Sequence, residues 1–476
     1  MAGKGWVTGF CIAAGVILLV GSGLRLYGIN RQSAWADELT TLLITDPALG
    51  FTEFWQRVVA DTHPPLYYLL MRGWSAVFGQ TDLAARLPSA VFGILMIAAA
   101  GAMPLPQSGR LTLMALMAIS PGAIEFAQEG RSYALLLLLS TVVTGACLGT
   151  VARLPEGRGR PRALALLTVS GIIASYTHYF GFLLAVAAGA VTAAAVRSRR
   201  TALAIAVIVA SFSPWVIYHA QHMSSGALLA AWMADFPLAA TASWFLRLWL
   251  GDDTTLLALV LLLATLLALP RPAALAVPNR ALLVGLSLAS LTAAAAGIIS
   301  WWVPILSARN LVVVMPALYL AMAALAADAM VLSRAAGVGG VAVVSILMLA
   351  RVEWYYSAQT KEQWRESAAL VLAQPGCAKG PIHVYGDGAI YRYLVGKARP
   401  ELELIEIPWG KAAGIEAQPA GDCPVALWAA KISPEDFAQV LSELPAHKAA
   451  CRQVAAFYWA FVVMRDPDDP ACKQMP

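Results

Sequence analysis

Two neighbouring acids just after the first apolar segment are the best candidates for acid–base chemistry in this chain. Asp37 and Glu38 lie in the stretch SAWADELTT, directly beyond an apolar run that ends near residue 27. A partly desolvated carboxylate at a membrane edge can act as a general base toward a hydroxyl nucleophile. The competing interpretation is that one of the two caps a helix beginning at Leu39, since Asp is a favoured N-cap residue.

Two arginines outside the basic loops are candidates for binding an anion. Arg309, in WWVPILSARNLVVVMP, has no acidic residue close to it in the sequence and precedes an apolar helix. The first N–H groups of such a helix suit an anion. Arg131, in QEGRSYALLLLL, follows Glu129 and could bind a phosphate through its planar fork. The alternative is that Arg131 extends to the membrane interface, the commoner fate of a lone arginine.

The histidines give no pattern typical of a metal site. His63 begins HPPLYY, where two prolines favour an extended backbone before the next segment, and the alternative is a rigid turn with a surface histidine. The spacing of His63, His178, His219 and His222 is not that of zinc ligands. The sequence therefore predicts no metal site and no organic cofactor. A divalent cation stays open, with no residue set in its favour.

The elements that must position these residues are long and apolar. Of 476 residues, 59% are hydrophobic and 13% charged, and the mean hydropathy is +0.68. Soluble domains carry about 25% charged residues, so a water-soluble enzyme is excluded. Eleven runs have the length of membrane-spanning helices. They are 6–27, 86–103, 111–127, 133–152, 163–178, 180–196, 201–220, 254–270, 281–303, 310–332 and 337–356.

The basic residues define a topology for these spans. Every second connection is basic, and the net charge is +5. By the positive-inside rule these connections face the cytoplasm. The N-terminus is then cytoplasmic, the first segment is a retained span, and the residues beyond 356 lie outside. The 13-residue run 66–78 contains Arg72 and is too short to span, so we expect it to lie parallel to the membrane on the outer face.

The composition changes at about residue 357, which predicts a transmembrane domain over 1–356 and a soluble α/β domain over 357–476. Strands are expected at 382–385, 425–430 and 454–464. A helix is expected at 433–444, where Ser and Pro precede acids. We expect this domain to cover an outer cavity and help select the acceptor.

The cysteines of the soluble domain favour an oxidising compartment. Four of the six lie in this domain, and an even cluster in a small domain suggests disulfides. The three pairings of these four stay open, as does the alternative of free buried thiols; they are Cys377, Cys423, Cys451 and Cys472. The other two, Cys11 and Cys147, lie in apolar segments and are expected to be small core residues.

Several of these stretches together resemble the bacterial family 39 glycosyltransferases of the GT-C fold. This family is similar to protein O-mannosyltransferases and to the lipid A aminoarabinose transferase. The matching stretches occur in the family's order over most of residues 20–320. They are WADE at 35–38, HPPLYYLL at 63–70, FGQTDLAARLPSAVFG at 78–93, QEGRSYALLLLL at 128–139, YTHYFGFLL at 176–184 and SARNLVVVMPAL at 307–318. The last departs from the aromatic form of the motif, RY.

The resemblance implies transfer of a sugar from a polyprenyl-phosphate donor to an acceptor hydroxyl, with inversion, on the extracytoplasmic face of the bacterial inner membrane. Membrane lipid is an expected partner, nucleic acid is not, and the acceptor is a lipid, glycan or protein. Carried over by motif, the catalytic acids are Asp37 as general base, its partner Glu38, and Glu129. Arg309 and Arg131 would bind the donor phosphate. The substrate-binding residues would be His63, Tyr67 and His178.

Two other classes of function compete with this interpretation. A polytopic transporter or flippase of a lipid-linked or small anionic substrate would also carry charges at membrane depth. It predicts internal repeats and broken helices in matching halves, and the sequence has neither. A non-enzymatic scaffold would use the soluble domain to bind a partner, and replacing Asp37 by Asn should leave a scaffold unaffected.

Overall fold

The structure is a computed structural model that describes residues 2–152, 159–222, 238–251, 279–374, 376–377, 381–396, 398–409, 423–443 and 452–465. The chain forms two compact units. Unit 1 comprises residues 1–29, 45–79 and 83–357, and unit 2 comprises residues 30–44, 80–82 and 358–476. Residues 30–44 therefore belong to the same unit as residues 358–476. The division predicted from the sequence, after residue 356, places them in the other unit.

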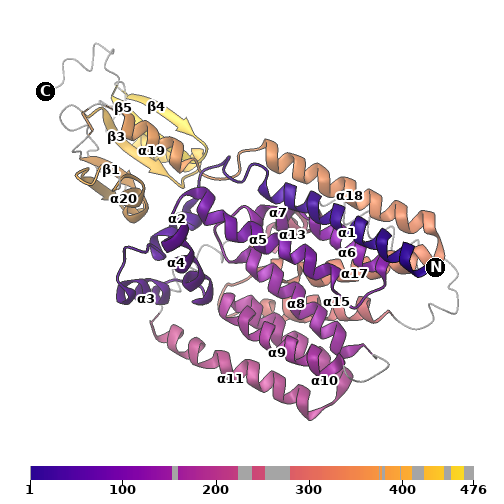
Figure 1. Cartoon of the computed structure of the whole chain (residues 1–476). Helices are drawn as coiled ribbons and strands as arrows, with labels where there is room; N and C mark the ends of the chain where they lie inside the picture. The colour runs from indigo at the N-terminus through magenta and orange to yellow at the C-terminus, as the bar shows by residue number, and fades with distance from the viewer. Residues whose placement is uncertain are drawn as a thin grey trace. The chain divides into compact units, whose positions relative to one another are not determined.

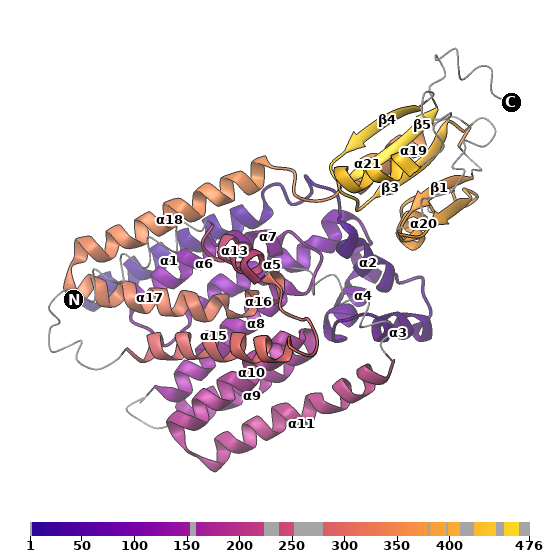
Figure 2. The same ribbon diagram turned by 180° about the vertical axis from the view of Figure 1, so that it is seen from behind.

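Unit 1 is helical throughout the residues that the structure describes, and in both views α8, α9 and α10 lie side by side, as do α15 and α17 (Figures 1 and 2). Its helices are α1 (Ala2–Leu26), α3 (Phe51–Ala60), α4 (Leu66–Phe78), α5 (Asp82–Gly101), α6 (Gln107–Ala118), α7 (Pro121–Ala127), α8 (Tyr133–Val151), α9 (Gly159–Thr177), α10 (Tyr179–Val196), α11 (Arg199–His222), α13 (Leu238–Leu250), α15 (Arg280–Ile299), α16 (Ala308–Leu311), η2 (Val312–Val314), α17 (Met315–Leu332) and α18 (Arg334–Ser357).

Eight of the described helices are long and apolar enough to cross a membrane, and the bent pair α6 and α7 gives a ninth candidate. The predicted fold class, a polytopic helical membrane protein with a small α/β domain, is confirmed. The count of eleven spans stays a prediction. Span 254–270 lies outside the described residues, and 163–178 falls in α9, which is not among the eight. The predicted 66–78 segment is α4.

A bend of 57° between α6 and α7 directs the chain toward residues 128–132, the connection to α8 that contains Glu129. Arg25, fully buried, donates to Met117 O at 2.9 Å and to Ala118 O at 3.0 Å. The last carbonyls of a helix have no intrahelical partner, so the guanidinium satisfies the end of α6 inside the bundle. Ser120 then caps α7, with Pro121 in its first turn.

Unit 2 is built on a five-stranded mixed sheet with strand order β2-β1-β3-β5-β4. Its elements are α2 (Ala36–Ile44), α19 (Trp364–Ala373), β1 (Ile382–Tyr385), α20 (Gly388–Gly396), β2 (Leu404–Ile407), β3 (Val425–Ala430), α21 (Pro434–Glu443), β4 (Arg452–Phe457) and β5 (Ala460–Arg465). The central strand β3 is buried at every position. Trp428 packs in a cluster with α19 and α20, and Leu427 packs in another with Phe437 of α21.

Two sequence predictions need correction. The predicted strand 454–464 is wrong as a single strand, because β4 and β5 pair antiparallel across a turn at Tyr458 and Trp459. The run VAAFYWAFVVM holds no Gly or Asn to mark that turn, and Trp459 itself adopts φ +54°. Cys11 is exposed on the surface of unit 1, whereas Cys147 is buried as predicted. Strands 382–385 and 425–430 and the helix at 433–444 are confirmed.

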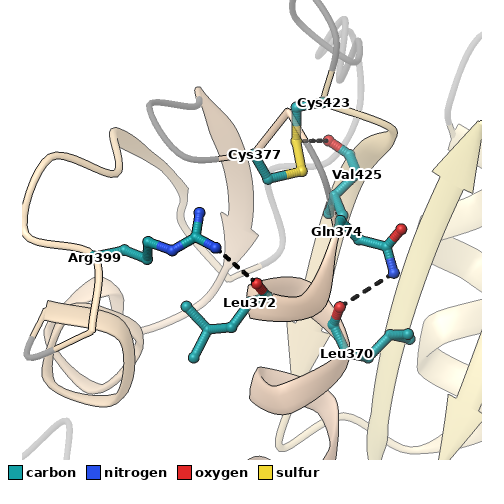
Figure 3. Close-up of a disulfide and its surroundings, with 7 residues drawn as sticks. All are labelled: Leu370, Leu372, Gln374, Cys377, Arg399, Cys423 and Val425. Carbon is teal, nitrogen blue, oxygen red and sulfur yellow. Dashed lines mark hydrogen bonds between the residues drawn. A yellow bond between two sulfur atoms is a disulfide. The ribbon is translucent and has the colours of Figure 1, made fainter.

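A disulfide joins Cys377, which follows α19, to Cys423, which precedes β3 (Figure 3). The two residues are 46 positions apart, and both are buried. Nearby, Arg399 donates to Leu372 O at 3.1 Å, which fixes the chain after α20 to the end of α19. Cys451 and Cys472 lie outside the described residues, so only one pair of the predicted four is defined here.

Replacing Cys377 and Cys423 together by Ser should destabilise unit 2. A cross-link that closes a loop of this size typically contributes about 2–4 kcal/mol to the free energy of unfolding. We expect the double variant to unfold at lower urea concentration when followed by near-ultraviolet circular dichroism. The matched control is Cys11→Ser, which removes an exposed free thiol. A double variant as stable as the control would show that the bridge contributes nothing to folding.

Candidate active site

Arg309 is the centre of an ion cluster in unit 1. It is the second residue of α16, whose first turn is capped by Ser307 Oγ. Its Nη1 and Nη2 donate to Oε2 and Oε1 of Glu129, both at 3.2 Å, which is the bidentate geometry of an arginine fork. A second acid, Glu125 on α7, has Oε1 at 3.9 Å from Nη2. Arg309 has no acidic neighbour in the sequence, but the fold brings two acids to it.

Aromatic rings complete the surroundings of the Arg309 guanidinium. Its central carbon lies 5.7 Å from the ring centroid of Phe126 and 5.8 Å from those of Tyr133 and Trp244. Such contacts favour a cation over the ring face. The Glu129 side chain is almost fully buried, and that of Arg309 is 15% exposed. The cluster therefore holds one guanidinium between two carboxylates, and an oxyanion would bind Arg309 by sharing or displacing the Glu129 carboxylate.

A second polar cluster of unit 1 centres on Asp61, between α3 and α4. Its Oδ2 accepts hydrogen bonds from Tyr68 Oη at 2.6 Å and from His63 Nδ1 and N, each at 3.0 Å. His219 Nε2 donates to Asp61 O at 2.7 Å. Burial works against ionisation of Asp61, but the hydrogen bond and charge of His63, then the charge of Arg131, outweigh it. They hold the pKa of Asp61 well below its usual range.

His178 lies beside this cluster as the N-cap of α10. Its Nδ1 accepts from Phe180 N at 3.2 Å, so the proton of a neutral ring is on Nε2. Among the described residues, Nε2 of this buried ring has no hydrogen-bond partner. A donor in that state is available to an oxygen of a ligand.

Tyr133 connects the two clusters. Its ring centroid is 5.8 Å from that of His178 and 5.8 Å from the guanidinium carbon of Arg309. The His63 and His178 rings are in turn 5.3 Å apart. The Arg309 cluster and the Asp61 cluster therefore lie on either side of the buried ring of Tyr133 in unit 1.

The predicted acids of the first loop belong to unit 2. Asp37 is the second residue of α2 and is partly exposed. Glu38 is buried, and its Oε2 accepts from Lys361 Nζ at 3.1 Å and from Trp35 N at 3.3 Å. The helix starts at Ala36, three residues earlier than the sequence-based alternative. Glu38 thus acts in a buried ion pair, and Asp37 is the acid of the two with access to solvent.

The structure brings together most of the unit 1 residues predicted from the sequence, namely Glu129, Arg309, His63, His178 and Arg131. Of these, Arg131 lies beside the Asp61 cluster, where it interacts with Asp61 and Tyr68. Tyr67 is different, because its ring packs in an apolar cluster with Met71, Leu135 and Leu139. Sequence reasoning gave no role to Asp61, Tyr68, Tyr133 or His219. The spacing D-x-H before the prolines is the one local signal for Asp61.

Metal binding finds no support among the residues that the structure describes. No group of three or more His, Cys, Asp or Glu side chains in them is arranged to hold a metal ion. The Arg309 cluster has two acids but places a cation of its own between them.

The described helices and the small sheet define a polytopic membrane protein, and its fold matches the GT-C fold that the sequence resemblance implies. Comparison with solved structures supports this at the level of fold. The chain matches the apo crystal structure of ArnT from Cupriavidus metallidurans with a TM-score of 0.54 at 15% identity, covering 98% of each chain.

Two further structures match less closely. ArnT bound to undecaprenyl phosphate gives a TM-score of 0.49 at 15% identity, covering 98% of this chain and 99% of that chain. The archaeal oligosaccharyltransferase AglB from Archaeoglobus fulgidus gives 0.46 at 10% identity, covering 97% of this chain and 75% of that chain. No family model and no curated protein sequence matches the chain.

Proposed function

We propose that this chain is an integral-membrane glycosyltransferase that moves a sugar from a polyprenyl phosphate to an acceptor hydroxyl, with inversion. The observation that carries the proposal is the Arg309 cluster, in which Glu129 holds the guanidinium in place among aromatic rings and the arginine side chain stays 15% exposed. It lies at the start of an apolar span, where a lipid-linked anion would meet it. ArnT, whose fold this chain shares, has been crystallised with undecaprenyl phosphate, which is consistent with this donor.

The donor carries its own leaving group, so the chain needs to supply two functions. Arg309 would bind the phosphate and stabilise the charge that develops as the bond from the anomeric carbon to the phosphate oxygen breaks. Glu129 would hold the fork in orientation. His178 Nε2–H and Arg131, close to the Asp61 cluster, would donate hydrogen bonds to oxygens of the donor, with His63 beside them.

The second function is deprotonation of the acceptor. Asp37 would accept the proton of the acceptor hydroxyl as its oxygen bonds to the anomeric carbon. The bond from the acceptor oxygen to the anomeric carbon forms as the bond from that carbon to the phosphate oxygen breaks. Asp37 ends protonated, and the lipid phosphate leaves as an anion. Asp37 suits this role because it is partly exposed, whereas its neighbour Glu38 is buried in an ion pair.

The proposed orientation places unit 2 on the extracytoplasmic side of the bacterial inner membrane, which follows from the basic connections. We expect a membrane-impermeant maleimide to label Asp387→Cys, an exposed position before α20, in intact spheroplasts. Ser198→Cys, between α10 and α11, should react only after the membrane is permeabilised. Both are made in a background with Cys11, Cys451 and Cys472 replaced by Ser, because Cys11 is exposed and the state of the other two thiols is not defined. The reverse labelling pattern would contradict the orientation.

The acceptor is a hydroxyl of an envelope lipid, glycan or secreted protein. Mass spectrometry of the envelope fractions of a deletion strain should show one class of molecule lacking a sugar residue. Expression of the wild-type chain should restore it, and expression of Asp37→Asn should not. An unchanged envelope in the deletion strain, under conditions in which the wild-type chain is produced, would count against the proposal.

A further inference from the structure

The helix that carries Asp37 is held by residues that are more than 300 positions away in the sequence. The N–H of Ala36, the first residue of α2, donates to Glu362 Oε2 at 2.7 Å. The same oxygen accepts from Trp364 Nε1 at 3.1 Å. A helix N-terminus has N–H groups without intrahelical partners. Here a carboxylate of the tail, itself nearly buried, takes the place of a local N-cap.

A second contact fixes the other side of Asp37. Glu38 Oε2 accepts from Lys361 Nζ at 3.1 Å, and the exposed fractions of the two side chains are 1% and 6%. A charge pair this far from water is weakly screened and depends on both partners. Residues 361 and 362 therefore hold the positions on either side of Asp37.

Side chains of the first segment also bind the backbone of the second. Gln32 Oε1 accepts from the N–H groups of Thr360 at 2.9 Å and Lys361 at 3.0 Å. Ser33 Oγ donates to Glu362 O at 2.6 Å. All of these groups belong to unit 2. Residues 32–38 and 360–364 thus form one hydrogen-bonded network, with Asp37 on its partly exposed side.

We propose that Lys361 and Glu362 are positioning residues for Asp37, so that the tail sets the orientation of the proposed base. The inference rests on the proposed function, because Asp37 has a reaction to perform only there. A base must reach its proton at hydrogen-bond distance, and misplacement by about 1 Å can slow a reaction about 100-fold. The network offers that control, since both neighbours of Asp37 in α2 are fixed by residues 361 and 362.

The test compares variants of the full-length protein in transfer from a polyprenyl-phosphate sugar. Lys361→Met and Glu362→Ala should each lower kcat about tenfold or more, with KM for the donor unchanged. The double variant Glu38→Lys with Lys361→Glu exchanges the two charges. It should restore part of the kcat that Lys361→Met loses. The control is Arg392→Gln, which removes an exposed ion pair with Glu406 in the same unit and should leave kcat unchanged.

The outcomes separate the inference from the proposed function. Wild-type kcat in Lys361→Met and Glu362→Ala, with Asp37→Asn inactive, would overturn the positioning role and leave the base in place. Wild-type kcat in Asp37→Asn would overturn the base itself. If the charge exchange restores nothing, and the single variants lose donor binding and thermal stability along with kcat, the contacts serve folding alone and the inference fails.

Discussion

Asp37→Asn is expected to slow sugar transfer about 100-fold or more while leaving donor binding nearly unchanged. The amide keeps the size of the side chain but cannot accept the acceptor proton, and removal of a general base typically costs about 10²–10⁴-fold. Asp37 is partly exposed in the first turn of α2, so the substitution should cost little stability. The measurement is single-turnover transfer, with donor binding assayed separately.

The control for this variant is Asp387→Asn, an exposed acid of unit 2 that accepts from Ala389 N before α20. It should transfer sugar at the wild-type rate. Equal rates for Asp37→Asn and the control would remove Asp37 as the base. Loss of donor binding together with transfer would instead assign Asp37 to the donor site.

Arg309→Ala should weaken donor binding and slow transfer together. A hydrogen bond to a charged group contributes about 1.5–3 kcal/mol, so we expect donor affinity to fall about 10-fold to 100-fold. Arg309→Lys should restore only part of it, because an ammonium lacks the planar fork. The alanine variant should also be less stable, since it leaves the nearly buried Glu129 carboxylate without its bidentate partner.

The double variant Arg309→Ala with Glu129→Gln separates these two effects. Removing the buried charge should recover stability, measured by thermal unfolding in detergent. If Arg309 binds phosphate, donor affinity and transfer stay low in the double variant. Full recovery of both would show that Arg309 only neutralises Glu129 in the fold.

The sequence was informative where the physical constraint is local. Membrane-length apolar runs, the start of α21 and the strands β1 and β3 were predictable because hydrophobicity and capping residues are read along the chain. The turn at Tyr458 and Trp459 was not, since neither residue type signals it.

The candidate site shows the same limit. Residue type and motif named Arg309, Glu129, His63 and His178 as candidates, but they did not show which of them contact one another. The ion pair between Arg309 and Glu129 spans 180 positions, and the one between Lys361 and Glu38 spans 323. Such pairs arise from the tertiary fold and leave no characteristic spacing in the sequence. Tyr67, inside a matching motif, packs in an apolar cluster, and its contact with substrate stays a prediction.

The most direct test of the central claim is the fate of the bond between sugar and lipid phosphate. Purified protein in nanodiscs is supplied with a polyprenyl-phosphate sugar, labelled in the sugar, and an envelope extract from a deletion strain as acceptor. We predict that free polyprenyl phosphate and labelled acceptor appear in equal amounts, and that Asp37→Asn lowers both. An intact donor after incubation with the wild-type protein, together with movement of that donor across the membrane when the same protein is reconstituted in vesicles, would contradict a transferase and identify a flippase instead.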